Sequence, residues 1–226
     1  SASIAHELKQ PLNTISMAAQ NLEAIISSPK FEVSAAEAKI ARMLAQVDRA
    51  SNVIDRMRRF GRKSIGDNER VDLTELVEGV VSMMRPVLDH AGTSVEIDIS
   101  EGLVALVDGL QVEQVVANLL QNAADAISGI GTMAAGRRGG HIRIVGFHAP
   151  DATRQAVLRV EDNGPGFPDG ALERALEPFF TTKPAEQGTG LGLAICDAIL
   201  RESGGFLELG NHADGGFVTL HMPGVT

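Results

Sequence analysis

The chain has 226 residues, a hydrophobic content of 44% and one cysteine, Cys196, which permit one or two domains with a sizeable core and exclude an internal disulfide. The formal net charge is −9 at pH 7, and because no stripe of Lys and Arg offsets it, a nucleic-acid partner is disfavoured. No stretch reaches the about 18 apolar residues of a membrane span, so we expect a soluble cytoplasmic fragment whose membrane contact, if any, is made by missing N-terminal regions.

The first predicted helix runs to about Ser27, and an apolar residue recurs every three or four positions along one face. These residues are Ile4, Leu8, Leu12, Ile15, Ala19, Leu22 and Ile26. His6 lies about 200° round the helix from Ile4, and Gln10 lies about 40° further on, so both side chains should face outward. An exposed histidine most often belongs to an ordinary polar face, but an imidazole can also be a base, a metal ligand or a nucleophile. Because no second His or Cys lies nearby at ligand spacing, the nucleophile is the interpretation to test.

A second helix is predicted from Ser34, where Ser34 and Glu37 have the spacing of a capping box. Its apolar seam passes through Ile40, Met43, Leu44, Val47, Ile54 and Met57. Two long helices with narrow apolar seams and a short turn form an antiparallel hairpin that cannot bury its apolar face alone. We therefore expect residues 1–64 to form a homodimer through a four-helix bundle, and the polar residues 65–71 to be a linker.

Residues 72–226 change to a pattern of mixed helix and strand. Helices are predicted from a capped start at Asp72 to about Gly92, over residues 110–127 and over residues 191–202. Short strands are predicted over residues 94–99, 103–107, 141–148, 155–161, 206–209 and 216–222, and residues 162–188 are predicted to be irregular. This order predicts an α+β fold in which the helices pack on one face of a mixed sheet.

Polar and glycine-rich clusters mark this second domain. Asn118 and Asn122 are four residues apart and so share a helix face. Asp162 ends a predicted strand and is followed by Gly164 and Gly166, whose missing side chains let backbone approach a ligand. Taken singly, the first cluster is an ordinary polar stripe and the second an ordinary turn.

Two further clusters follow in the sequence. The segment E-P-F-F-T-T-K covers residues 177–183, and the segment G-T-G-L-G-L covers residues 188–193 and leads directly into a predicted helix. A glycine-rich turn at a helix N-terminus presents backbone donors and a positive dipole end to phosphate. Each glycine motif is weak in isolation, whereas the joint order and spacing of all four clusters is informative.

These four clusters, preceded by H-E-x-x-Q-P-L at residues 6–12, strongly resemble the sensor histidine kinases of two-component signalling. The resemblance covers essentially the whole chain, and the form of the first motif is similar to the subset that includes nitrogen and dicarboxylate sensors. It implies a dimerisation and phosphoacceptor hairpin followed by an ATP-binding α/β sandwich of the Bergerat type. It also implies autophosphorylation by Mg-ATP and phosphoryl transfer to an aspartate of a response-regulator receiver domain.

The resemblance assigns catalytic and metal-binding roles by position. His6 would attack the γ-phosphate of ATP, and Glu7 would hold or accept the proton on the other ring nitrogen. Asn122 matches the magnesium ligand of the family, and Asn118 matches an asparagine on the phosphate side.

The resemblance also assigns the nucleotide-binding residues. Asp162 would accept a hydrogen bond from the adenine amino group, with Gly164 and Gly166 giving the base its space. The phosphates would lie against the segment Gly188, Thr189, Gly190, Leu191 and Gly192. A mobile lid over the nucleotide would include Phe179, Phe180 and Lys183.

Two positions go beyond the general match. ATP-hydrolysing relatives such as gyrase-type enzymes carry a water-activating glutamate four residues before the magnesium asparagine, where this chain has Asn118. Hydrolysis by water should therefore be poor. Gln10 stands where many relatives have Thr or Asn that positions a water, which predicts phosphatase activity on the phosphorylated response regulator.

Two other functions compete with this interpretation. A Bergerat ATPase or molecular clamp would need a water-activating acid and would turn over ATP independently of His6. A signalling scaffold that binds ATP only to change shape would be expected to lack at least one chemical residue, yet His6, Glu7, Asn122 and Asp162 are all present.

Overall fold

The computed structural model describes residues 2–27, 33–61, 68–128, 139–149, 155–183 and 190–225. It divides into two compact units, Ser1–Lys63 and Ser64–Thr226. In the first unit, the side chains of residues 2–11, 48–49 and 51–61 are outside the description. The side chains of His6 and Gln10, which were expected to face outward, therefore lie outside the described residues. Gly188 and Thr189, which were expected to contact the phosphates, also lie outside them.

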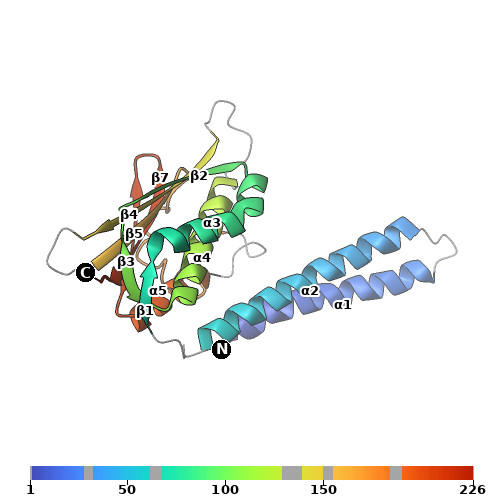
Figure 1. The fold of residues 1–226 in the computed structure, drawn as a ribbon. Helices are drawn as coiled ribbons and strands as arrows, with labels where there is room; N and C mark the ends of the chain where they lie inside the picture. The colour runs from blue at the N-terminus through green and yellow to red at the C-terminus, as the bar shows by residue number, and fades with distance from the viewer. Residues whose placement is uncertain are drawn as a thin grey trace. The chain divides into compact units, whose positions relative to one another are not determined.

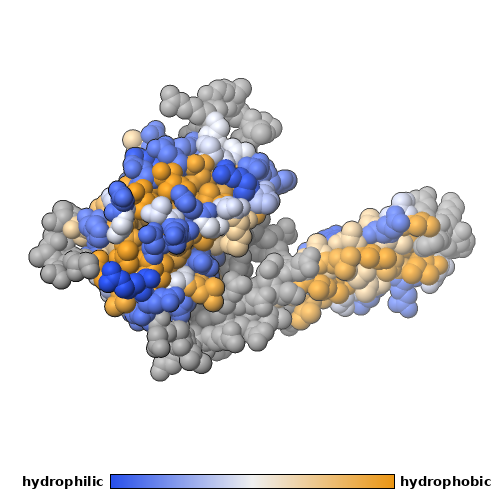
Figure 2. All heavy atoms as spheres, in the orientation of Figure 1, coloured by the Kyte–Doolittle hydropathy of each residue, from blue (hydrophilic) through white to orange (hydrophobic). Residues whose placement is uncertain are grey.

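The first unit is a hairpin of two long helices, α1 (Ala2–Ile26) and α2 (Val33–Gly61), which contact each other. Among its described side chains, only Ala18 and Ala36 are buried apolar residues. Seven large apolar side chains remain between 45% and 64% exposed: Leu12, Met17, Ile26, Val33, Ile40, Leu44 and Val47. Figure 2 shows this apolar surface running along the hairpin. The hairpin thus leaves uncovered an apolar face of the kind that its sequence predicted.

Two boundaries differ from the sequence prediction. Helix α2 begins at Val33, so Ser34 lies in the first turn of the helix and is not its N-cap. Residues Glu69–Val71, expected in a linker, instead belong to strand β1 (Glu69–Asp72), which pairs antiparallel with β3 (Val104–Val107). The polar residues of β1 carry no periodic apolar signal, and their pairing depends on a strand more than 30 residues away, so the sequence pattern missed it.

The second unit is built on a five-stranded sheet in the order β2-β4-β5-β7-β6. These strands are β2 (Thr93–Ile99), β4 (Gly140–His148), β5 (Gln155–Asp162), β6 (Phe206–His212) and β7 (Gly215–Pro223). Strand β2 is parallel to β4, and the other neighbours are antiparallel. In this register Asp162 is the last residue of β5, opposite Ile142 of β4.

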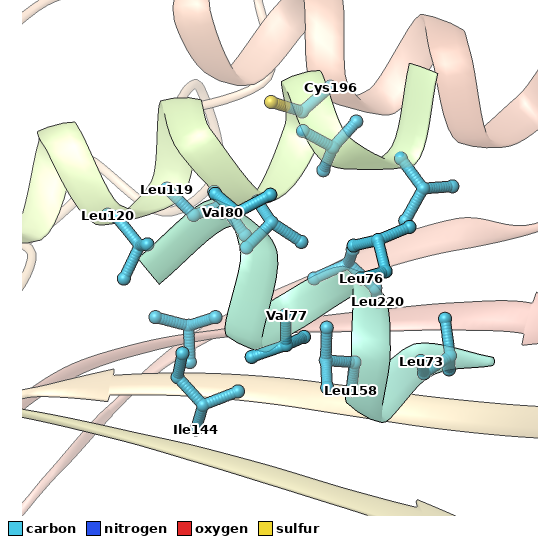
Figure 3. Packing of buried hydrophobic residues seen from close by; sticks show 14 of the residues in the cluster. Leu73, Leu76, Val77, Val80, Leu119, Leu120, Ile144, Leu158, Cys196 and Leu220 are labelled. Atoms are coloured by element: carbon cyan, nitrogen blue, oxygen red, sulfur yellow. The ribbon is translucent and has the colours of Figure 1, made fainter. Parts of the chain in front are cut away.

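Three helices, α3 (Leu73–His90), α4 (Gly109–Ser128) and α5 (Gly192–Glu202), contact the sheet, and α4 also contacts both α3 and α5 (Figure 1). Their apolar residues recur at helical spacing and meet the inward side chains of alternating strand positions. Figure 3 shows Leu76, Val77 and Val80 of α3 with Leu119 and Leu120 of α4, Ile144 of β4, Leu158 of β5 and Leu220 of β7. Helices on a mixed sheet, after a helical hairpin, confirm the predicted α+β fold.

The start of α3 agrees with its predicted cap. Asp72 is the N-cap of α3, because its carboxylate accepts hydrogen bonds from the backbone amides of Thr74 at 2.8 Å and Glu75 at 3.3 Å.

Within the described residues, no helix is both long and apolar enough to cross a membrane.

Candidate functional site

The asparagine face of α4 is the first part of the site. Asn118, Asn122 and Asp125 follow one another at intervals of four and three residues, so they share one side of the helix, and all three are half-buried. A Cβ built on Gly192, the first residue of α5, would lie 3.5 Å from Nδ2 of Asn122. The predicted magnesium asparagine and the glycine-rich turn therefore lie side by side, although 70 residues separate them in the sequence.

Asn118 is turned toward α5. Its Nδ2 lies 3.9 Å from Sγ of Cys196, which is buried. Burial raises the pKa of the Cys196 thiol to about 12, with the hydrogen bond from Asn118 opposing that rise. Cys196 is therefore a neutral thiol at physiological pH and packs as a small buried residue that orients Asn118.

The carboxylate of Asp162 is the second part of the site. The backbone amide of Gly164 donates to Asp162 Oδ1 at 2.8 Å. Burial raises the pKa of the Asp162 carboxyl above its ordinary value, whereas hydrogen bonds from the amides of Gly164 and Gly216 and the nearby His212 lower it in part. A half-buried carboxyl that keeps backbone donors on it is oriented, and it can accept a further hydrogen bond from a ligand.

The segment that contains Phe179 and Phe180 is tied to the glycine-rich turn. The amide of Phe179 donates to the carbonyl of Gly190 at 2.9 Å, and both residues have positive φ, 71° and 64°. A Cβ on Gly190 would lie 2.4 Å from the carbonyl carbon of Phe179, so only glycine allows this close approach. The guanidinium of Arg174 lies 4.6 Å from the centre of the Phe180 ring.

Lys183 is joined to α4 by a contact that the sequence patterns did not predict. Its Nζ lies 2.7 Å from Oδ2 of Asp125, and Nε2 of Gln121 donates to Oδ1 of the same carboxylate at 2.7 Å. Asp125 lies one helical turn after Asn122, which was the available signal, since residues three apart share a face. The structure therefore brings Lys183 to the same helix face as the two asparagines.

The start of α5 completes the site. Leu191 is the N-cap of α5, and its buried side chain makes no capping hydrogen bond. Gly192 places the positive end of the helix beside Asn122, an arrangement that suits an anionic ligand.

Magnesium fits this set of donors. Among the described residues, no group of three or more His, Cys, Asp or Glu could hold a metal ion. The amide of Asn122 has no hydrogen-bond partner within the described residues, so its oxygen is available to a cation. A hard cation held by one amide oxygen would take its other ligands from phosphate and water, which is the usual arrangement for Mg²⁺ with a nucleotide.

Two family matches account for most of the chain. Residues 107–225 match the family described as histidine kinase-, DNA gyrase B-, and HSP90-like ATPase, and residues 1–66 match the His Kinase A (phospho-acceptor) domain. The chain belongs to the sensor histidine kinases of two-component systems. The first description also names DNA gyrase B- and HSP90-like ATPases, and the phosphoacceptor match over residues 1–66 narrows the assignment to histidine kinases. Recognition of the family from its motifs is thereby confirmed.

Curated relatives agree with this assignment. The C4-dicarboxylate transport sensor protein DctB of Pseudomonas aeruginosa is 36% identical over 228 residues, covering 100% of this chain and 36% of DctB. The nitrogen regulation protein NtrY of Azorhizobium caulinodans is 31% identical, covering 94% of this chain and 26% of NtrY. The chain thus spans about a third or less of the length of these histidine kinases.

Solved structures show the same fold. The catalytic domain of histidine kinase ThkA is 29% identical with a TM-score of 0.58, covering 70% of this chain and 96% of that chain. Acinetobacter baumannii histidine kinase AdeS has a TM-score of 0.73 at 22% identity, covering 96% of this chain and 97% of that chain. The ATP-binding sandwich predicted for residues 72–226 is therefore the fold of histidine kinase catalytic domains.

Proposed function

We propose that this chain is the catalytic core of a sensor histidine kinase that uses Mg-ATP to phosphorylate His6. The observation that carries the proposal is the presence, in one chain, of a phosphoacceptor domain containing His6 and a histidine kinase ATPase domain. In the reaction, the lone pair of a ring nitrogen of His6 attacks the γ-phosphorus, and the bond from that phosphorus to the β,γ-bridging oxygen breaks, releasing ADP. Glu7 holds the proton on the other ring nitrogen, which keeps the attacking nitrogen unprotonated.

Different residues would contact the base, the phosphates and the metal ion. Asp162 accepts a hydrogen bond from the adenine amino group, and the start of α5 with Gly190, Leu191 and Gly192 faces the phosphates. Gly188, Thr189, Phe179, Phe180 and Lys183 complete the phosphate side and its lid. A bound Mg²⁺, with Asn122 as its protein ligand, would neutralise charge on the phosphate oxygens.

The absence of a water-activating acid favours histidine over water as the acceptor. Asn118 occupies the position where hydrolytic relatives carry glutamate, and an amide cannot take a proton from water. The carboxylate nearest to Asn122 on the same face of α4 is Asp125, which is paired with Lys183. Poor intrinsic hydrolysis is therefore expected, in contrast to a Bergerat ATPase.

Dimerisation follows from the apolar face of the hairpin. Seven large apolar side chains of α1 and α2 are exposed when the hairpin is alone, and a second copy would bury them in a four-helix bundle. We therefore infer a homodimer through residues 1–64, with residues 72–226 as the ATP-binding domain.

The onward acceptor is an aspartate of a response-regulator receiver domain. A solved complex of histidine kinase ThkA with response regulator protein TrrA has a TM-score of 0.74 to this chain at 21% identity, covering 99% of this chain and 60% of that chain. That complex supports a receiver domain as the partner class, and the acidic net charge of −9 disfavours a nucleic acid.

Labelling of the protein by ATP tests this function. Incubation with Mg²⁺ and ATP radiolabelled at the γ position should transfer label to the protein as an acid-labile, alkali-stable phosphoramidate. EDTA should prevent the transfer, because the phosphate oxygens then lack their cation. If the chain binds ATP yet acquires no such label, or if it hydrolyses ATP steadily without labelling, the kinase proposal is wrong.

Gln10 supplies a separate prediction about dephosphorylation. It lies one helical turn after His6 on α1, and its amide can position a water against the phosphoryl-aspartate of the partner. Gln10→Ala should slow the loss of phosphate from a phosphorylated receiver domain by about tenfold while leaving autophosphorylation of His6 intact. An unchanged dephosphorylation rate would remove this role from Gln10.

A further inference from the structure

The loop from Asp162 to Phe167 is held at both ends by two consecutive residues of β6. At its start, Nε2 of His212 lies 3.2 Å from the carbonyl oxygen of Asp162. The amide of Asp214 donates to Nδ1 of the same ring at 3.4 Å. Because Nδ1 accepts, Nε2 carries the ring proton and donates to Asp162. His212 is therefore oriented by its own turn and fixes the backbone at the start of the loop.

At the end of the loop, the side chain of Asn211 bonds to both backbone groups of Phe167. Oδ1 of Asn211 accepts from the amide of Phe167 at 2.7 Å, and Nδ2 donates to its carbonyl at 2.8 Å. Two such bonds to one residue reproduce the pairing that a neighbouring strand would offer. An amide is required for this, since a carboxylate has no donor and a serine hydroxyl is too short to reach both groups.

The loop packs so closely against the β6–β7 hairpin that little space is left for side chains at Gly166 and Gly216. Gly166 has a φ of 71°, and a Cβ on it would lie 2.7 Å from Oδ1 of Asn211. Gly216 is the β7 partner of Asn211, and a Cβ there would lie 3.5 Å from Oδ2 of Asp162 and 3.4 Å from Cα of Gly166. Asn211 and Gly216 therefore pack closely against the loop at Asp162, Gly166 and Phe167.

The same pair orients the carboxylate. The amide of Gly216 is one of the two backbone donors to Asp162, and the other is the amide of Gly164 within the loop. If Phe167 were released, the loop could shift relative to Gly216, and the carboxylate would lose its fixed direction. Asn211 itself is exposed on the edge strand of the sheet, so its importance here comes from the two hydrogen bonds to Phe167, not from core packing.

We propose that Asn211 is a positioning residue that sets the base specificity of the nucleotide site. It fixes the loop so that the Asp162 carboxylate meets the amino group of adenine at the correct angle. The inference rests on the proposed function, because it takes ATP as the ligand. The phosphate side of the site, on α4 and α5, does not touch Asn211 and should be unaffected by its loss.

Binding of two nucleotides that differ by one group tests this role. Purine riboside triphosphate keeps the ring, ribose and phosphates of ATP but lacks the 6-amino group. Competition against a fluorescent ATP analogue should show that the parent prefers ATP. In Asn211→Ala, the affinity for ATP should fall about tenfold, as expected for a misaligned hydrogen bond to a charged group, while the affinity for purine riboside triphosphate should change less than about twofold.

Two companion variants make the result specific. Glu208→Ala removes an exposed side chain from the same strand, one that contacts His221 and not the loop, and it should keep the preference of the parent. Asn211→Asp keeps the acceptor for the amide of Phe167 but loses the donor to its carbonyl, so it should show an intermediate preference. Circular dichroism shows whether each variant is folded. If Asn211→Ala does not fold, the ATP preference of Asn211→Asp tests the role instead.

The outcomes separate this inference from the proposed function. An ATP preference equal to that of the parent in folded Asn211→Ala, or in Asn211→Asp, would overturn the role of Asn211. An equal loss of affinity for both nucleotides would also overturn it, because the residue would then act on general stability. Failure of the parent chain to bind ATP would instead count against the proposed function.

Discussion

Replacement of His6 by glutamine should abolish phosphoryl transfer to the protein while leaving ATP binding unchanged. Glutamine is a good helix former and keeps hydrogen-bonding capacity, but its amide nitrogen has no nucleophilic lone pair. Loss of a nucleophile removes the reaction pathway, so labelling from γ-radiolabelled ATP should fall by more than about a hundredfold. The residues proposed to bind the nucleotide belong to a different compact unit from His6, so the Kd for ATP should stay within about twofold.

His90→Gln is the matched control for this experiment. His90 is exposed in the last turn of α3, and the same substitution there should leave labelling at the level of the parent. The chain has no Trp and no Tyr, so ATP binding must be followed by displacement of a fluorescent nucleotide. Label that persists in His6→Gln would place the phosphoacceptor at another residue.

Replacement of Asp162 by asparagine should weaken ATP binding by about ten- to a hundredfold. The variant exchanges a charged acceptor for a neutral amide, and a hydrogen bond to a charged group contributes about 1.5–3 kcal/mol. The backbone amides of Gly164 and Gly216 orient the carboxylate, and an amide would meet the adenine amino group correctly in only one of its two orientations. Displacement of a fluorescent nucleotide gives the affinity, and a thermal unfolding curve shows that the variant is folded.

The pH dependence of binding gives this prediction a second readout. Because burial raises the pKa of the Asp162 carboxyl, the group takes up its proton at a higher pH than an ordinary aspartate would. ATP affinity in the parent should therefore decline as the pH falls through that raised pKa, since a protonated carboxyl loses acceptor strength. In Asp162→Asn this part of the pH dependence should be absent.

Asp169→Asn is the appropriate control for both readouts. Asp169 is exposed in the turn that follows the Asp162 loop. Its substitution changes the net charge by the same amount as Asp162→Asn and leaves the proposed adenine contact in place. It should bind ATP as the parent does and keep the same pH dependence. If Asp162→Asn binds ATP as tightly as Asp169→Asn, then Asp162 does not recognise adenine.

Local sequence patterns predicted every secondary-structure element except β1, the two domains of the family and the clusters in which the site is proposed. These features are local: an apolar residue every three or four positions, an alternating strand, a capping aspartate at Asp72 and glycines at a helix start each signal within a few residues. The element boundaries were predicted less accurately. The start of α2 at Val33 and the pairing of β1 with β3 depend on contacts with residues outside the few neighbours that a sequence pattern covers.

The contacts that support the proposed site join residues far apart in the sequence. Lys183 meets Asp125 across 58 residues of sequence, and Asn211 meets Phe167 across 44. Each contact joins polar groups that have no fixed spacing from one another in the sequence, so no local pattern predicts the pairing. Such pairs depend on the order of strands in the sheet and on the packing of α4 against α5. The candidate site residues could thus be predicted from local sequence motifs, whereas the side chains that hold them in place become recognisable only when distant segments fold together.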